Sequence, residues 1–238
     1  MASANRNRLC TDGFKRESDH MIPCVDTDTR HVALFGGTFD PIHSGHLRIA
    51  YELYQTCFFD EFAFMPCYQP VHKAENQGVP VQVRLAMLES ALEATPFVIE
   101  HAEIERAGPS YAVDTLENLK KMHVKRHYYF VMGADSLLSF HKWQRFERLL
   151  ELVHLVVVGR PGYVINERSA IMAYLQGRLV DSLEQLQSEE AGLVYISPWM
   201  MLDISSTMVR ECLKKNESIR YLVPEPVEQM ILQLNCYK

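Results

Sequence analysis

The sequence lacks the features typical of membrane, secreted and nucleic-acid-binding proteins. Its apolar runs are far shorter than the roughly 18 residues of a membrane-spanning helix, and no signal-peptide segment opens the chain. Its six cysteines are scattered without a C-x-x-C pair, which excludes a disulfide framework or a cysteine zinc site and favours reduced thiols in the cytoplasm. A net charge of −6 argues against long nucleic acids but is compatible with a small anionic ligand. We therefore expect a cytoplasmic protein that binds neither a membrane nor a nucleic acid.

Length and composition nevertheless allow a full hydrophobic core. The chain has 238 residues, of which 47% are apolar and 23% charged, as in ordinary globular proteins. Residues 1–30 mix charges without periodicity, and we expect them to be a disordered or extra N-terminal extension. Residues 31–238 are expected to form a single domain with a helical C-terminal part.

From residue 31 onward, short apolar runs alternate with helical patterns. Strand-like runs lie at 32–35, 62–65, 97–99, 128–132, 155–158 and 193–196. Helices are predicted at 46–57, around 85–92, at 111–122, 137–150 and 167–177, from 205, and after Pro224 and Pro226. This alternation predicts an α/β fold, a Rossmann-like doubly wound parallel sheet with helices on both faces. Ligands of such sheets bind beyond the carboxyl ends of the strands.

Residues 31–46, HVALFGGTFDPIHSGH, contain the strongest signal for such a ligand site. The first strand ends at Gly36 and Gly37, which would allow positive φ and bring a ligand against bare backbone. Neither a dinucleotide fingerprint nor a P-loop is present. His43 and His46 are three residues apart at the start of a helix, so both imidazoles face one side, where helix amides favour an anion. We interpret this as a polyphosphate site; the alternatives are locally packed histidines, or zinc, for which further ligands are missing.

The segment resembles the signature of the nucleotidylyltransferase superfamily, whose H-x-G-H marker matches residues 43–46. The superfamily's second marker, I-S-S-T-x-[IV]-R, is similar to residues 204–210, ISSTMVR. This second motif also has physical sense, since Ser205 or Ser206 can cap a helix and Arg210 can bind a phosphate with two hydrogen bonds. The alternative is a plain capped helix with a solvated arginine.

The middle of the chain resembles bacterial nicotinate-mononucleotide adenylyltransferases. Residues 103–116, EIERAGPSYAVDTL, are similar to E-x-x-R-x-G-x-S-Y-x-x-D-T-L of that family, and residues 133–143, GADSLLSFHKW, to its G-A-D-x-x-x-x-x-x-x-W. Residues 160–162 match its R-P-G, whereas PCYQPVHK departs from P-x-x-x-P-P-H-K at Val71. Pantetheine-phosphate and glycerol-phosphate relatives share the two phosphate motifs but not this middle set. The resemblance extends from about residue 31 to the C-terminus.

The resemblance implies transfer of the adenylyl group of ATP to nicotinate mononucleotide with release of pyrophosphate. The Mg²⁺ cofactor would be held mainly by the ATP phosphates, without protein ligands. The implied catalytic residues are His43, His46 and Arg210. The implied ATP and phosphate site comprises Gly36, Gly37, Thr38, Phe39, Lys73, Ile204, Ser205, Ser206 and Thr207. The implied nicotinate mononucleotide site comprises Tyr111, Thr115, Gly133, Asp135, Trp143 and Arg160.

Within that second site, the resemblance assigns Trp143 to stacking on the pyridine ring, Tyr111 with its neighbouring backbone to the carboxylate and Asp135 to a ribose hydroxyl. A core tryptophan on an amphipathic helix is the alternative for Trp143. Three further functions stay open: the same chemistry on nicotinamide mononucleotide, the same chemistry on pantetheine phosphate, and a non-catalytic adenine-nucleotide-binding module. The sequence does not indicate an oligomeric state.

Overall fold

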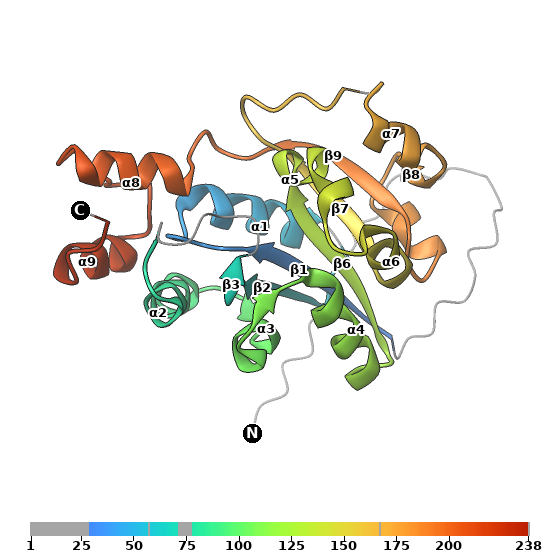
Figure 1. Cartoon of the computed structure of the whole chain (residues 1–238), viewed down its shortest axis with the longest axis horizontal. Helices are drawn as coiled ribbons and strands as arrows, with labels where there is room; N and C mark the ends of the chain where they lie inside the picture. The colour runs from blue at the N-terminus through green and yellow to red at the C-terminus, as the bar shows by residue number, and fades with distance from the viewer. Residues whose placement is uncertain (1–28, 57, 71–77, 167, 238) are drawn as a thin grey trace, which may run out of the picture.

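A parallel β-sheet forms the centre of the computed structural model, which describes residues 29–56, 58–70, 78–166 and 168–237 (Figure 1). The strand order is β4-β2-β1-β6-β7-β9-β8, and neighbouring strands are all parallel. The strands are β1 (Arg30–Gly37), β2 (Glu61–Pro66), β4 (Val98–Ile99), β6 (Arg126–Gly133), β7 (His154–Gly159), β8 (Leu179–Val180) and β9 (Val194–Met200). Two short strands, β3 (Gln69–Pro70) and β5 (Pro109–Ser110), pair separately. The predicted α/β fold is confirmed.

Helices connect these strands. The α-helices are α1 (Ser44–Thr56), α2 (Val81–Leu92), α3 (Ala102–Arg106), α4 (Ala112–Met122), α5 (Ala134–Leu138), α6 (Phe146–Leu152), α7 (Ala170–Leu175), α8 (Ser206–Lys214) and α9 (Glu225–Gln233). Short 3-10 helices are η1 (Phe140–Lys142), η2 (Gln176–Arg178) and η3 (Glu184–Ser188). None of the helices in the described part of the chain is long and apolar enough to cross a membrane.

The prediction of one helix over residues 137–150 is wrong. The chain instead forms α5, η1 and α6, with a break after η1 where Trp143 is extended and Arg145 has a left-handed backbone (φ 50°). Apolar spacing cannot distinguish one helix from short helices that bury the same face. The break matters because it determines where the Trp143 side chain lies.

Each face of the sheet carries its own hydrophobic core because side chains alternate along a strand. Ala33 and Phe35 of β1 face a cluster that includes residues of α1, α2, α8 and α9. Val32 and Leu34 face the other cluster, with residues of α4, α5, α6 and α7. Figure 1 shows α2, α8 and α9 gathered at one end of the molecule and α4 and α6 at the other. Helices therefore cover both faces, as the sequence pattern predicts.

The predicted N-terminal extension lies almost entirely outside the described residues, which begin at residue 29. The first strand, β1, begins at Arg30. The division into an extension over 1–30 and one domain over 31–238 stays a prediction.

At the amino ends of the central strands, a buried histidine joins β7 to its surroundings. His154 is completely buried; the amide of Leu193 donates to its Nδ1 at 3.2 Å, which assigns the ring proton to Nε2, 3.0 Å from the carbonyl of Glu189. His31 is also buried, with its Nδ1 2.8 Å from the hydroxyl of Tyr129. Burial lowers the pKa of both histidines, that of His154 to about 4.

This burial predicts loss of stability in mild acid. Above pH 6.5 His154 is neutral in the folded and unfolded chain, whereas below 6.5 only the unfolded chain takes up the proton until the pH nears 4. The free energy of unfolding should therefore fall by about 3 kcal/mol over this range through His154. Urea unfolding of wild type and His154→Gln, whose amide can still donate to Glu189, measures this contribution. Identical pH dependence in the two proteins would contradict it.

Candidate active site

A cavity of about 420 Å³ opens at the carboxyl ends of β1, β2, β6 and β7. This is the edge of a doubly wound sheet where ligands bind. Most of the site residues expected from the sequence line it: Gly36, Gly37, Thr38, Phe39, His43, His46, Tyr111, Gly133, Asp135, Trp143, Arg160, Ile204, Ser206, Thr207 and Arg210. Segments more than 170 residues apart along the chain thus meet in one pocket.

Three expected residues are not among those lining the cavity. Ser205 is the N-cap of α8, and its hydroxyl accepts a hydrogen bond from the amide of Met208 at 3.1 Å, so its side chain serves the helix. Thr115 is buried within α4, where its hydroxyl contacts Glu103 at 3.4 Å; its contact with the mononucleotide stays a prediction. Lys73, like Val71, lies outside the described residues.

The two glycines at the end of β1 are required for close packing rather than for positive φ. Neither is among the described residues with positive φ, which corrects the expectation for this turn. Both belong to β1. A Cβ on Gly36 would lie 2.6 Å from the ring of Phe130, and a Cβ on Gly37 would lie 2.7 Å from the ring of Phe39. Any side chain here would displace an aromatic ring of the pocket.

His43 and His46 lie with their rings stacked, 3.6 Å between centroids and 25° between planes. Helix α1 positions them, because it begins at Ser44 and turns the His46 ring back over His43. The backbone amide of His43 donates to Nδ1 of His46 at 3.3 Å. This contact assigns the proton of a neutral His46 to Nε2, which makes Nε2 a hydrogen-bond donor in the pocket wall.

The His43 ring is held neutral by its surroundings. It is only 2% exposed, and burial, with a smaller contribution from the charge of Arg160, lowers its pKa to about 3. Its Nδ1 has no hydrogen-bond partner among the described residues and lies 3.0 Å from where a Cβ on Gly45 would be. Gly45 therefore leaves room for this ring, and His43 enters the site as a neutral hydrogen-bonding group.

The two phosphate motifs are joined directly by hydrogen bonds. The hydroxyl of Ser206 donates to the carbonyl of Pro41 at 2.9 Å. The guanidinium of Arg210 donates to the carbonyl of Asp40 at 2.7 Å and to the hydroxyl of Thr207 at 3.2 Å. These contacts bring the amino end of α8 beside the amino end of α1. Two helix N-termini, both favourable for anions, thus border one pocket.

Asp135 and Arg160, which also line the cavity, form an ion pair between the ends of β6 and β7. A Cβ on Gly133 would lie 2.4 Å from a carboxylate oxygen of Asp135, so Gly133 is what allows this carboxylate to approach the strand end. The pair leaves Asp135 with hydrogen-bond accepting capacity and Arg160 with donors, as binding of a sugar phosphate requires.

Aromatic side chains form the remaining wall. The ring of Trp143 lies 6.0 Å from Phe130 and 5.6 Å from Phe140, both contacts being inclined rather than stacked. Tyr111 is the N-cap of α4 and lines the same cavity. Two aromatic residues from different segments thus line the same pocket.

Sequence reasoning missed Arg84, a buried arginine of α2 that shapes the pocket. It is 4% exposed and donates to the carbonyls of Thr38 and Cys67 at 2.7 Å and of Tyr68 at 3.0 Å. Burial lowers its pKa, and the nearby Asp40 opposes that shift. Arg84 therefore joins the loops that follow β1 and β2. A signal existed, because a single arginine falls at apolar helical spacing before Met87 and Leu88.

Glu103 is a second residue for which sequence analysis predicts no role. It is 2% exposed, lines the cavity, and has a carboxylate oxygen without a hydrogen-bond partner among the described residues. Burial raises its pKa, against hydrogen bonds from Ser110 and Thr115 and the charge of Arg106. Ser110 in turn accepts from the amide of Gln69 at 3.2 Å. Glu103 thus supports the short β3–β5 sheet beside the pocket.

Comparison with known proteins places this arrangement in a family. Residues 34–212 match the cytidylyltransferase-like family. A probable nicotinate-nucleotide adenylyltransferase of Marinomonas sp. is 37% identical, covering 87% of this chain and 94% of the relative; its counterpart in Methylococcus capsulatus is 36% identical, covering 87% and 99%. The structure of Plasmodium falciparum nicotinic acid mononucleotide adenylyltransferase complexed with NaAD has the same fold (TM-score 0.68, 18% identity, 87% of this chain and 97% of that one). The chain therefore belongs to the cytidylyltransferase-like family and, within it, to the nicotinate-nucleotide adenylyltransferases.

Proposed function

We propose that the protein transfers the adenylyl group of ATP to nicotinate mononucleotide, forming nicotinate adenine dinucleotide and pyrophosphate, a step of NAD biosynthesis. The observation that carries this proposal is one cavity whose lining includes residues of the H-x-G-H and I-S-S-T-x-x-R segments together with Tyr111 and Trp143. We call the cavity residues of the two motifs the phosphate wall, because they offer donors for phosphates, and we call Tyr111 and Trp143 the aromatic wall, because they offer faces for a pyridine ring. This division fits two substrates that react end to end.

The reaction requires positioning and charge stabilisation more than proton transfer. A phosphate oxygen of the mononucleotide attacks the α-phosphorus of ATP, and the bond from that phosphorus to the oxygen bridging to the β-phosphate breaks. Pyrophosphate leaves with this oxygen and its electron pair. Since the attacking phosphate is already anionic near neutral pH, no general base is needed. The site must hold the mononucleotide phosphate in line with the α-phosphate of ATP. It must also bind the negative charge that develops on the transferring and leaving phosphates.

The residues of the phosphate wall suit that work. His46 offers an Nε2–H donor, and His43 is a neutral neighbour stacked on it, so their rings can bind phosphate oxygens without repelling each other. Arg210 and Thr207 are already oriented by mutual contact and by Asp40. We assign the histidines to the α-phosphate region and the amino end of α8 to the β- and γ-phosphates.

We propose Mg²⁺ as the metal that accompanies ATP. Among the residues that the structure describes, no group of three His, Cys, Asp or Glu side chains could hold a metal ion, so the donor set fits a cation that arrives on the triphosphate. Bound there, such an ion would supply positive charge to the leaving pyrophosphate.

On the acceptor side we assign the inclined Trp143 ring to stacking on the electron-poor pyridine and Asp135 to a ribose hydroxyl. Tyr111, with its neighbouring backbone at the start of α4, is assigned to the nicotinate carboxylate, and Arg160 to phosphate. A cytoplasmic location is part of the proposal, because Cys212 and Cys236 are free thiols, as expected in a reducing compartment.

The proposal is tested by measuring Mg²⁺-dependent pyrophosphate release from ATP with three acceptors in parallel. We expect the highest kcat/KM with nicotinate mononucleotide. A preference for nicotinamide mononucleotide would overturn the acceptor assignment, and turnover with pantetheine phosphate alone would overturn the interpretation of the aromatic wall. ATP affinity by calorimetry without any pyrophosphate release would indicate a binding module and contradict catalysis.

A further inference from the structure

Trp143 lies in a short turn between the 3-10 helix η1 and helix α6. The 3-10 helix η1 ends at Lys142, Trp143 is extended (φ −72°, ψ 145°), and α6 begins at Phe146. Between them Arg145 has φ 50°, a left-handed conformation that is uncommon for a residue with a side chain. A segment with such a backbone persists only when surrounding contacts over-determine it.

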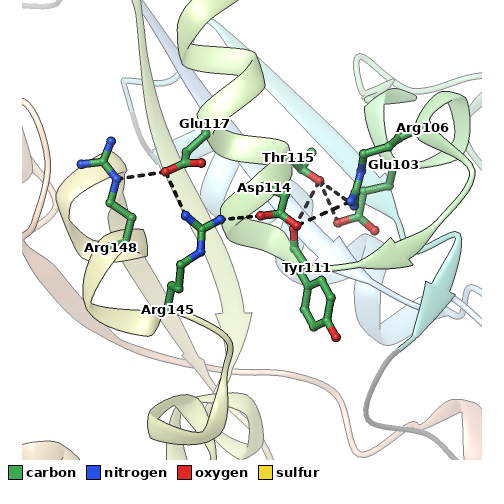
Figure 2. Close-up of polar contacts among 8 residues, drawn as sticks. All are labelled: Glu103, Arg106, Tyr111, Asp114, Thr115, Glu117, Arg145 and Arg148. Atoms are coloured by element: carbon green, nitrogen blue, oxygen red, sulfur yellow. Dashed lines mark hydrogen bonds and ion pairs between the residues drawn. The ribbon is translucent and has the colours of Figure 1, made fainter.

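Those contacts come from the side chain of Arg145 itself. Its guanidinium donates to a carboxylate oxygen of Asp114 and, at 3.3 Å, to one of Glu117 (Figure 2). The two carboxylates are three residues apart and therefore share one face of α4. A planar guanidinium bound at two points fixes orientation as well as distance. The turn that carries Trp143 is thus attached to α4.

The same helix also begins at the second aromatic residue of the cavity lining, Tyr111. Tyr111 is the N-cap of α4, one turn before Asp114. Asp114 also faces Arg106, 3.7 Å away at the end of α3, and Arg106 contacts the hydroxyl of Thr115 at 3.4 Å. Figure 2 shows Asp114 between the two arginines. These ion pairs thus connect the turn that carries Trp143 with the helix that begins at Tyr111.

We infer that Arg145, through Asp114 and Glu117, is a positioning residue that holds Trp143 at the correct distance from Tyr111 to receive the pyridine ring of the acceptor. The inference rests on the proposed function for the identity of the acceptor. Under this inference Arg145, Asp114 and Glu117 do not contact the substrates. They contribute to binding of the acceptor but not to binding of ATP. Preorganised positioning of this kind lowers the ordering cost that substrate binding would otherwise bear.

Arg148 provides a matched control, because it shares Glu117 with Arg145. It has no hydrogen bond to Asp114 within the described part of the chain. It donates to Glu117 at 3.1 Å and to Glu151 at 2.7 Å, and its side chain is 46% exposed against 44% for Arg145. However, Arg148 lies inside the regular helix α6, beyond the turn that carries Trp143. If the ion pairs only stabilised the fold, replacing either arginine would have a similar effect. If Arg145 positions Trp143, only the replacement of Arg145 should affect acceptor binding.

Steady-state kinetics of Arg145→Met and Arg148→Met separate these possibilities. We expect Arg145→Met to raise KM for nicotinate mononucleotide about tenfold with KM for ATP unchanged within about twofold, and Arg145→Lys to recover part of the loss because one ion pair can re-form. Arg148→Met should change neither KM. Equal effects of the two methionine variants, or equal effects of Arg145→Met on both substrates, would overturn the inference.

Tryptophan emission gives a readout that does not depend on turnover. The chain has two tryptophans, so Trp199→Phe leaves Trp143 as the only one. In that background, Arg145→Met should increase quenching of Trp143 by acrylamide in the free protein and shift the titration with nicotinate mononucleotide to about tenfold higher concentration. Unchanged acrylamide quenching would overturn positioning by Arg145 even if the acceptor is correct. Failure of nicotinate mononucleotide to support turnover in the wild type, with the quenching difference intact, would refute the proposed function and not the positioning.

Discussion

Replacement of His46 by alanine lowers kcat by about 10²- to 10³-fold, the usual consequence of deleting one preorganised donor to a developing negative charge. The structure assigns the ring proton of His46 to Nε2, because Nδ1 accepts from the amide of His43. The ring also packs edge-on against Phe35 and Phe39, with centroids 5.8 and 5.1 Å away. Steady-state kinetics with saturating ATP and nicotinate mononucleotide measure the loss.

Two conservative variants of His46 distinguish the role of each ring nitrogen. Glutamine can present an N–H near the position of Nε2, whereas asparagine can replace only the acceptor near Nδ1. We expect His46→Gln to retain more activity than His46→Asn. His123→Ala, at an exposed position just after α4, is the control and should turn over normally. Near-normal kcat in His46→Ala, with an unchanged thermal melt, would contradict the assignment.

Substitution of Arg84 by methionine should destabilise the protein by about 3–5 kcal/mol. The carbonyls of Thr38, Cys67 and Tyr68 would lose the donor that all three share. Unsatisfied buried polar groups cost about 1–3 kcal/mol each. The carboxylate of Asp40, which lies near Arg84, would also lose a positive charge that faces it. The free energy of unfolding in urea measures the effect.

The same helix offers a control for the new side chain. Gln82 is exposed on α2, so Gln82→Met should alter the free energy of unfolding by less than about 0.5 kcal/mol. Arg84→Lys should fall between wild type and Arg84→Met, because an ammonium group can bind some of the three carbonyls but lacks the fork of a guanidinium. If Arg84→Met were as stable as Gln82→Met, the loops after β1 and β2 would have to be held by other contacts.

The sequence was most informative where spacing itself carries the chemistry. Buried strands alternating with amphipathic helices predicted the sheet, and three-residue spacing predicted that His43 and His46 share a side. Ser205 was expected as one possible cap of α8, and its hydroxyl does accept from the amide of Met208. These features are local, because each depends on residues a few positions apart. They were sufficient to predict that the two motifs lie at the carboxyl ends of the strands.

Features that depend on distant residues could not be predicted. The hydroxyl of Tyr237 donates to Asp40 at 2.6 Å across 197 positions, and no local pattern indicates that contact. The break that orients Trp143 is fixed by carboxylates of α4 acting on Arg145, which apolar periodicity does not register. Gly36 and Gly37 were expected to supply positive φ, but ring packing in three dimensions is what requires them.

The fate of labelled oxygen tests the central claim most directly. Nicotinate mononucleotide carrying ¹⁸O in its phosphate is incubated with ATP, Mg²⁺ and the protein, and the ¹⁸O content of both products is measured by mass spectrometry. Attack on the α-phosphorus predicts that all the label stays in nicotinate adenine dinucleotide and that the pyrophosphate carries none. Label in the pyrophosphate, or release of AMP without a dinucleotide, would contradict the account.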